Sequence, residues 1–168
     1  MTEVLAYVAL GSNLDNPESQ IRAAMDALDA LPQSCLQACS SLYRSAPMGP
    51  QDQPDYVNAV VGLSTALGPH ALLDQLQAIE HAQGRVRARH WGPRTLDLDI
   101  LLYGEDVLTS ERLRIPHAGI AQRNFVLYPL AEISPQLEIP GLGSVKSLLE
   151  RCSDEGLWRL PTMVRSAG

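Results

Sequence analysis

The sequence predicts an α+β fold with a β-α-β-β-α-β core and a mainly antiparallel sheet. Segments rich in β-branched residues alternate along the chain with segments whose apolar residues recur at helical spacing. Their order is that of a ferredoxin-like sheet with its helices on one face. The length of 168 residues suits one domain, which we expect over residues 1–160, followed by a flexible tail at 161–168.

The first strand and helix are predicted from residues 4–31. Residues 4–10 alternate as a strand does, and Gly11 interrupts them. Asn16 and Pro17 are expected as the cap and the first position of a helix that Pro32 ends. One apolar stripe supports this helix: Ile21, Ala24, Met25, Leu28 and Leu31.

The next three predicted elements of the core are two strands and a helix. Residues 35–44 are predicted as one strand, and residues 56–65 as a second strand after a loop rich in proline, glycine and aspartate. Gly68 and Pro69 then open a helix that ends near Gly84.

The last core strand begins at Leu96 and is expected to turn at residues 103–106 into a hairpin with residues 107–108. Beyond this turn the pattern is less regular, and one helix is predicted at 144–152. Four prolines are expected to break the other regular segments: Pro116, Pro129, Pro135 and Pro140.

The composition limits the possible partners and the compartment. The formal net charge of −6 argues against a general nucleic-acid or anionic-membrane binder. No apolar run near the start is long enough to span a membrane, and none has the basic lead of a signal peptide. The cysteines are odd in number, so we expect reduced, buried thiols in a cytoplasmic protein: Cys35, Cys39 and Cys152.

Asp97 and Asp99 are the most informative residues. Successive strand side chains point to opposite faces, so these two carboxylates share one face, and the other face takes Leu96, Leu98, Ile100 and Leu102. A solvent-exposed face of a half-buried sheet would explain the pattern alone. The arginines immediately upstream instead favour a Mg²⁺ site.

Four arginines precede this strand within one loop that glycine and proline bracket: Arg85, Arg87, Arg89 and Arg94. A solvated basic loop and an anion site are about equally good explanations of the arginines alone. Together with two strand carboxylates, they indicate a polyphosphate held by Mg²⁺ and guanidinium groups. The sequence contains no GxxxxGK[ST] motif, so any ATP site would lack a P-loop.

Two further groups suit an anion and a flat ring. The first is a basic group after the turn: Arg112, Arg114, His117 and Arg123. The second offers aromatic faces and an amide that could read a ring edge: Tyr56, Asn58 and Phe125. Core packing is the ordinary explanation for the second group, and the remaining histidines (His70, His81 and His90) are taken as structural.

Four segments together resemble the 6-hydroxymethyl-7,8-dihydropterin pyrophosphokinases of folate biosynthesis: YVALGSNL (7–14), YRSAPMGPQDQPDYVNAV (43–60), GRVRARHWGPRTLDLDILLYG (84–104) and RIPHAGIAQRNFVLYPLAEISP (114–135). The resemblance implies a three-layer α/β/α sandwich, in which a C-terminal hairpin and helices extend the core. It also implies transfer of pyrophosphate from ATP to a pterin alcohol by a protein that we expect to be a monomer.

The resemblance also implies roles by position. Asp97 and Asp99 would bind two Mg²⁺ ions. The nucleotide would be bound by Arg85, Arg87, Trp91, Arg94, Ile100, Arg112, His117 and Arg123, of which Arg85 and Arg94 would be catalytic. The pterin would be bound by Ser45, Ala46, Met48, Tyr56, Asn58, Trp91 and Phe125. No role is assigned to Arg89, Arg114 or Glu80.

The chain departs from the family pattern in three places. Ser45 and Ala46 replace a usual Thr-Pro pair, which is expected to loosen the pterin loop. Ala118 replaces a frequent tyrosine, and the stretch from Arg87 to Trp91 is one residue shorter than in well-known members.

Two other classes of function remain open at this level. An RNA-binding module shares the strand order and uses arginines beside aromatic residues, but the acidic balance argues against it. A two-metal phosphohydrolase would use the same carboxylates without a pterin.

Overall fold

The computed structural model describes residues 3–14, 16–46, 55–84 and 96–161. Its main sheet has the order β10-β3-β4-β1-β5, with β2 also paired to β4, and its strand pairs are antiparallel. The core strands are β1 (Val4–Ser12), β2 (Ser34–Cys39), β4 (Tyr56–Thr65) and β5 (Leu96–Tyr103). They have the neighbours of a ferredoxin-like sheet, as predicted.

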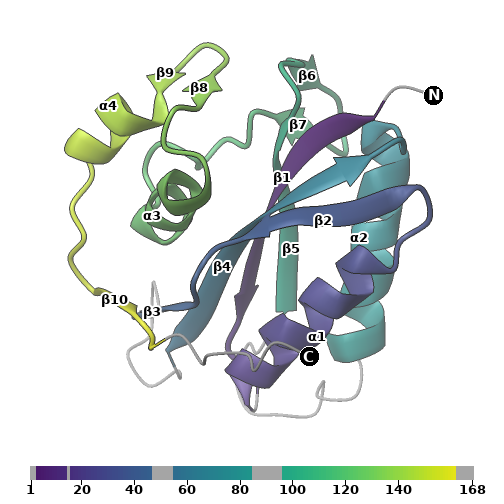
Figure 1. Ribbon diagram of the computed structural model, residues 1–168, viewed down its shortest axis with the longest axis horizontal. Helices are drawn as coiled ribbons and strands as arrows, with labels where there is room; N and C mark the ends of the chain where they lie inside the picture. Colours follow the sequence, from purple (N-terminus) through teal and green to yellow (C-terminus); the bar gives the residue numbers. More distant parts are fainter. Residues whose placement is uncertain (1–2, 15, 47–54, 85–95, 162–168) are drawn as a thin grey trace.

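Helices cover both faces of this sheet (Figure 1). One face carries α1 (Pro17–Asp29) and α2 (Pro69–Gly84), and the other carries α3 (Asn124–Ile133). The three-layer arrangement implied by the family resemblance is therefore confirmed, whereas the strand order alone had suggested helices on one face. No helix in the described part of the chain is both long and apolar enough to cross a membrane.

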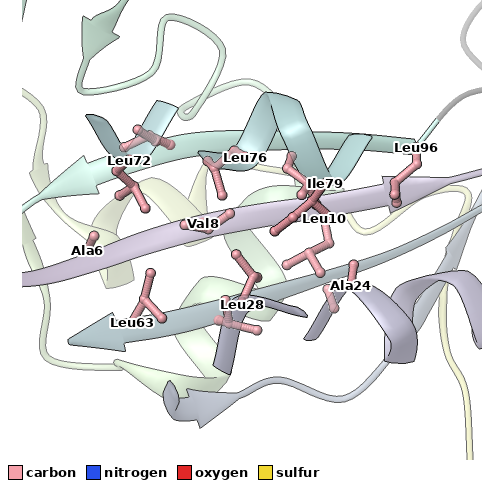
Figure 2. Packing of buried hydrophobic residues seen from close by; sticks show 14 of the residues in the cluster. Ala6, Val8, Leu10, Ala24, Leu28, Leu63, Leu72, Leu76, Ile79 and Leu96 are labelled. Atoms are coloured by element: carbon pink, nitrogen blue, oxygen red, sulfur yellow. The ribbon is translucent and has the colours of Figure 1, made fainter. Parts of the chain in front are cut away.

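The core between the sheet, α1 and α2 is built by alternate strand residues (Figure 2). Val8 and Leu10 of β1 are almost completely buried there, against Leu28 of α1 and Leu76 of α2. The predicted apolar stripes of both helices therefore do face the sheet. Helix α1 begins at Pro17 as expected, and the Asn16 carbonyl accepts the first helical bond, from the Gln20 N–H. The Asn16 backbone is left-handed (φ 54°), however, and its side chain makes no cap bond.

The predicted strand at 35–44 is two strands, β2 and β3 (Tyr43–Ser45), both paired with β4. At the break, Ser40 bonds to Val60 through both its backbone N–H and its side-chain oxygen, each at 2.9 Å. The next residue leaves the ladder, because the Ser41 N–H donates to Glu132 of α3. The bond from Ser41 to α3 thus divides the predicted strand into β2 and β3.

The predicted hairpin after β5 is wrong in its pairing. The turn exists, since the Asp106 N–H donates to the Tyr103 carbonyl at 3.0 Å. However, β6 (Leu108–Thr109) pairs with β7 (Arg114–Ile115) and not with β5. Further along, β8 (Glu138–Ile139) pairs with β9 (Gly143–Ser144).

Helix α3 was not predicted, because Pro129 lies inside it. The predicted helix at 144–152 is α4 (Val145–Glu150), with Ser144 accepting the Ser147 N–H as its cap. The last described strand, β10 (Leu157–Arg159), pairs with β3 and was not predicted either. Most of the predicted tail, residues 162–168, lies outside the described residues.

The prediction of buried cysteines is wrong. Cys35 and Cys39 are exposed, and Cys152 is half-buried; none of the three is in a disulfide. Cys35 pairs with Ser64 of β4, and Leu36 after it packs against the core. A register shift follows Leu36, and Cys39 lines a shallow pocket beside α1, where it stays exposed.

Candidate active site

A pocket of about 220 Å³ opens on the α3 face of the sheet. Nine of the fourteen described residues that line it are predicted site residues: Ser45, Ala46, Tyr56, Asn58, Asp97, Asp99, His117, Arg123 and Phe125. The other five were not predicted: Ala9, Leu10, Gly11, Leu101 and Val126. Residues far apart in the sequence therefore meet in one cavity.

Strand β5 carries Asp97 and Asp99 into this pocket, beside Gly11 and Ala9 of β1 respectively. Leu96, Leu98 and Ile100 point the other way and are at most 4% exposed. Leu102 was expected with them but lies on the α3 side beside Leu101. The cause is a register shift, because Tyr7 pairs with Leu102 and the next residue pairs with Ile100.

The floor of the pocket is made of small residues of β1. Gly11 lies between Asp97 of β5 and Asn58 of β4 in the sheet register. A Cβ atom at Gly11 would lie 3.2 Å from Asn58 Oδ1, so a larger residue would crowd this amide. The expected strand break at Gly11 is wrong, since β1 continues to Ser12. The alternation of Ala9 and Gly11 with buried apolar residues is the sequence signal of this floor.

Asn58 is held by Ser45. Its Nδ2 donates to Ser45 Oγ at 2.7 Å, and both residues are nearly buried. The neighbouring Ala46 N–H donates to the Gly156 carbonyl at 3.3 Å, a bond that proline could not donate. The Ser-Ala pair therefore ties the beginning of the pterin loop to the C-terminal segment.

His117 presents a defined ring nitrogen to the pocket. Its Nδ1 accepts the Gly119 N–H at 3.0 Å, and its backbone N–H donates to the Leu101 carbonyl at 3.0 Å. Burial lowers the pKa of His117, with Asp99 opposing and Arg123 reinforcing this effect. The neutral ring then carries its proton on Nε2, so His117 acts as a hydrogen-bond donor.

Arg123 and Phe125 lie together at the beginning of α3. The Arg123 guanidinium carbon is 5.9 Å from the centre of the Phe125 ring, within cation–π range. Gly119 leaves room for this arginine, because a Cβ atom there would lie 2.7 Å from Arg123 Nε. Asn124 fixes the helix start by donating to the Ser153 and Glu155 carbonyls, both at 2.9 Å.

Three predicted nucleotide or anion residues do not line this pocket. Arg112 instead forms an ion pair of 2.7 Å with Asp74 of α2 and a hydrogen bond with Gln77. Arg114 is exposed on β7, and the Ile100 side chain is buried in the core. The other predicted residues lie outside the described part of the chain: Met48, Arg85, Arg87, Trp91 and Arg94.

The carboxylates of the pocket fit Mg²⁺. Within the described ranges there is no group of three or more metal-ligating side chains. Mg²⁺ is usually bound by one or two carboxylates together with substrate phosphates and water, and not by an all-protein cage. Asp97 and Asp99 supply this smaller set of hard oxygen ligands.

Comparison with known proteins identifies the family. Residues 7–135 match the model of the 7,8-dihydro-6-hydroxymethylpterin-pyrophosphokinases. The chain is 56% identical over 155 residues to a 2-amino-4-hydroxy-6-hydroxymethyldihydropteridine pyrophosphokinase of Pseudomonas aeruginosa, covering 92% of this chain and 96% of that protein. Proteins of the same name from Haemophilus influenzae and Bacillus subtilis are 50% and 42% identical, covering 94% and 80% of this chain and 98% and 80% of theirs.

The fold also matches solved structures. The crystal structure of Plasmodium falciparum HPPK-DHPS with pteroate superposes with a TM-score of 0.71 at 13% identity. The match covers 89% of this chain and 42% of that longer chain, and at this identity it supports the fold alone. From the family model and the close relatives together, the chain belongs to the 7,8-dihydro-6-hydroxymethylpterin-pyrophosphokinase family.

Proposed function

We propose that the pocket on the α3 face is the active site of this pyrophosphokinase. The enzyme transfers pyrophosphate from ATP to 6-hydroxymethyl-7,8-dihydropterin, giving the pterin diphosphate and AMP in folate biosynthesis. One observation carries the assignment of the site. Nine residues predicted to bind pterin, metal or phosphate, spread between residues 45 and 125, line a single cavity.

The pterin occupies the part of the pocket between Tyr56 and Phe125. Flat rings stack on aromatic faces, and Asn58 offers an oxygen and an amide to the ring edge. The bond from Asn58 Nδ2 to Ser45 supports this assignment, because it orients the amide with its Oδ1 beside Gly11 at the floor of the pocket. Ala46 closes this end, and Met48 and Trp91 are proposed to join from outside the described residues.

The triphosphate lies over the two carboxylates. Asp97 and Asp99 would hold two Mg²⁺ ions, which supply neutralisation of phosphate charge when bound. Arg123 offers a fixed cation, and His117 donates from Nε2. Arg85 and Arg94 are proposed as further phosphate ligands, with Arg87 and Trp91 closing over the site.

The nucleoside end extends along the edge of β5 away from β1. The Leu98 N–H points to that edge, where it meets Glu80 of α2. Residues two apart in an antiparallel strand direct their backbone groups to the same side. Ile100 can therefore offer its backbone to the adenine although its side chain is buried, and Arg112 lies farther along the same side.

The transfer exchanges one P–O bond for another. The hydroxymethyl oxygen attacks the β-phosphorus, the bond to the oxygen shared with the α-phosphorus breaks, and AMP leaves with that electron pair. The hydroxyl proton passes to water. The side chains need to align the groups and neutralise charge, which is how most of the barrier is lowered in phosphoryl transfer.

Product identity tests this assignment most directly. Incubation with ATP, Mg²⁺ and 6-hydroxymethyl-7,8-dihydropterin should yield AMP and pterin diphosphate in equal amounts, measured by anion-exchange chromatography. Formation of ADP, or loss of ATP without pterin, would instead indicate a different transfer or a phosphohydrolase. Omission of Mg²⁺ should abolish the reaction.

The setting of the enzyme is proposed from the same features. Three cysteines outside any disulfide, two of them exposed, suit the reducing cytoplasm. We propose a single domain over residues 1–160 that works as a monomer on small molecules, without a nucleic-acid partner. Size-exclusion chromatography with light scattering would measure the mass in solution.

A further inference from the structure

We propose that Glu80 of α2 is a positioning residue for the Asp97–Asp99 pair, acting through the backbone of Leu98. The inference rests on the proposed function, in which these two carboxylates bind Mg²⁺. Glu80 Oε2 accepts the Leu98 N–H at 2.7 Å, so one helix side chain fixes the strand midway between the two acids.

The sheet explains why this bond is needed. Strand β5 ends the sheet, with β1 as its only sheet neighbour in the described order. Leu98 directs its N–H to the opposite edge, where none of the described strands pairs with β5. A strand edge without partners can shift or fray. The Glu80 carboxylate replaces the missing strand at the residue that separates Asp97 from Asp99.

Glu80 does not act as another metal ligand in this arrangement. It is absent from the described residues that line the pocket, since it reaches β5 along the edge of the sheet. Leu98 itself is 2% exposed and locked in the core on the opposite face. The backbone is thus held from two sides, by the Leu98 side chain and by Glu80, and both acids project from it into the cavity.

The electrostatics support a specific role. Burial raises the pKa of Glu80, the bond from Leu98 opposes this, and the charges of Asp97 and Asp99 raise it further. The charged form of a half-buried carboxylate is unfavourable near two other carboxylates. The hydrogen bond from the Leu98 N–H offsets part of this cost. A neutral acceptor of the same reach would keep the bond, which separates positioning from charge.

Three substitutions separate the effect of the hydrogen bond from the effect of the charge. Glu80→Gln keeps an oxygen acceptor of equal reach without the charge, Glu80→Asp keeps the charge but shortens the side chain, and Glu80→Ala removes both. The probe is Mn²⁺, read by electron paramagnetic resonance in the presence of an α,β-methylene analogue of ATP. Loss of a residue that orients metal ligands typically weakens metal binding by about 10- to 100-fold.

The expected order follows from the hydrogen bond. Glu80→Gln should bind Mn²⁺ within about threefold of the wild type, while Glu80→Asp and Glu80→Ala should weaken it by about tenfold or more. Hydrogen exchange of the Leu98 amide should accelerate in the same two variants only. Should Glu80→Ala not fold, Glu80→Asp still tests the proposal.

Asp29 provides the matched control. It is also a helix carboxylate that accepts a strand N–H, that of Leu36 on β2, at 3.0 Å. It lies on an exposed part of α1 and lines no part of the active-site pocket. Asp29→Ala should therefore leave Mn²⁺ binding unchanged.

The outcomes distinguish this inference from the proposed function. If the wild type binds no Mn²⁺, or binds it equally after Asp97→Ala, the metal site itself is wrong. If the wild type binds Mn²⁺ through Asp97 but Glu80→Asp and Glu80→Ala bind it equally well, the positioning role is wrong. Equal weakening in Glu80→Gln and Glu80→Ala would also overturn it, since charge would then be the cause.

Discussion

The two faces of the main sheet use the same strands for different purposes. On the α1 and α2 face, β1 and β5 present buried apolar side chains along their whole length, such as Leu10 and Leu96 (Figure 2). On the α3 face, Tyr7 and Leu101 are equally buried, but further along the strands Gly11 and the two aspartates replace them. One face is continuous core, whereas the other is half core and half cavity.

The difference shows how a small domain can contain a polar pocket and remain stable. Burial of apolar side chains contributes about 1.5–3 kcal/mol each, so the continuous face supplies most of the stability. The pocket face gives up this contribution beside the beginning of α3. Its buried polar groups are instead paired, as Asn58 is with Ser45. Substitutions on the two faces should therefore have different signatures.

The largest effect is expected for the pocket carboxylates. Asp97→Ala or Asp99→Ala should lower kcat by about 1000-fold or more, because the metal and phosphate charges lose their ligand. The melting temperature should stay close to that of the wild type, since neither side chain contributes to the core. Steady-state kinetics and calorimetry measure the two quantities, and full activity in both variants would contradict the site.

Leu98→Ala should show the reverse signature, although residue 98 lies between the two acids. Removing a side chain that is 2% exposed should lower the free energy of unfolding by about 2–5 kcal/mol. Urea denaturation measures this loss. The kcat of the folded fraction should fall far less than in the aspartate variants, and the opposite ranking would show that the two faces are not independent.

Ser45→Ala tests a paired polar group of the pocket face. It leaves the Asn58 amide donor buried without its partner, which should reduce stability by about 1–3 kcal/mol and raise the KM for the pterin. Ser45→Thr keeps the hydroxyl and should restore most of both. Failure of threonine to rescue the KM would indicate that the hydroxyl does not orient Asn58.

The smallest effect concerns pH. Burial lowers the pKa of His117, so the unfolded chain takes up a proton more readily than the folded chain does. The stability of the ligand-free enzyme should therefore fall as the pH drops below about 6.5 and towards the lowered value. His117→Gln should flatten this dependence, measured by denaturation between pH 5 and 8; an unchanged slope would contradict it.

Local patterns predicted the regular part of this molecule. The alternation in β5 predicted the shared face of Asp97 and Asp99, and the apolar stripes predicted α1 and α2, because these features follow from backbone geometry alone. The features that were not predicted depend on contacts with distant parts of the same chain. Pro129 argued against a helix that tertiary burial stabilises, and the 35–44 strand divides because Ser41 bonds to Glu132 of α3.

The sequence by itself determined the order of the core elements, the pairing of two acids on one strand face and the family to which the chain is similar. Only the tertiary structure decided which distant residues share the pocket, that Gly11 is its floor and that Glu80 reaches the Leu98 backbone. The physical reason is the distance along the chain over which each feature is determined. Alternation is fixed by neighbours along the chain, whereas a cavity exists only where separate elements end and leave the sheet uncovered.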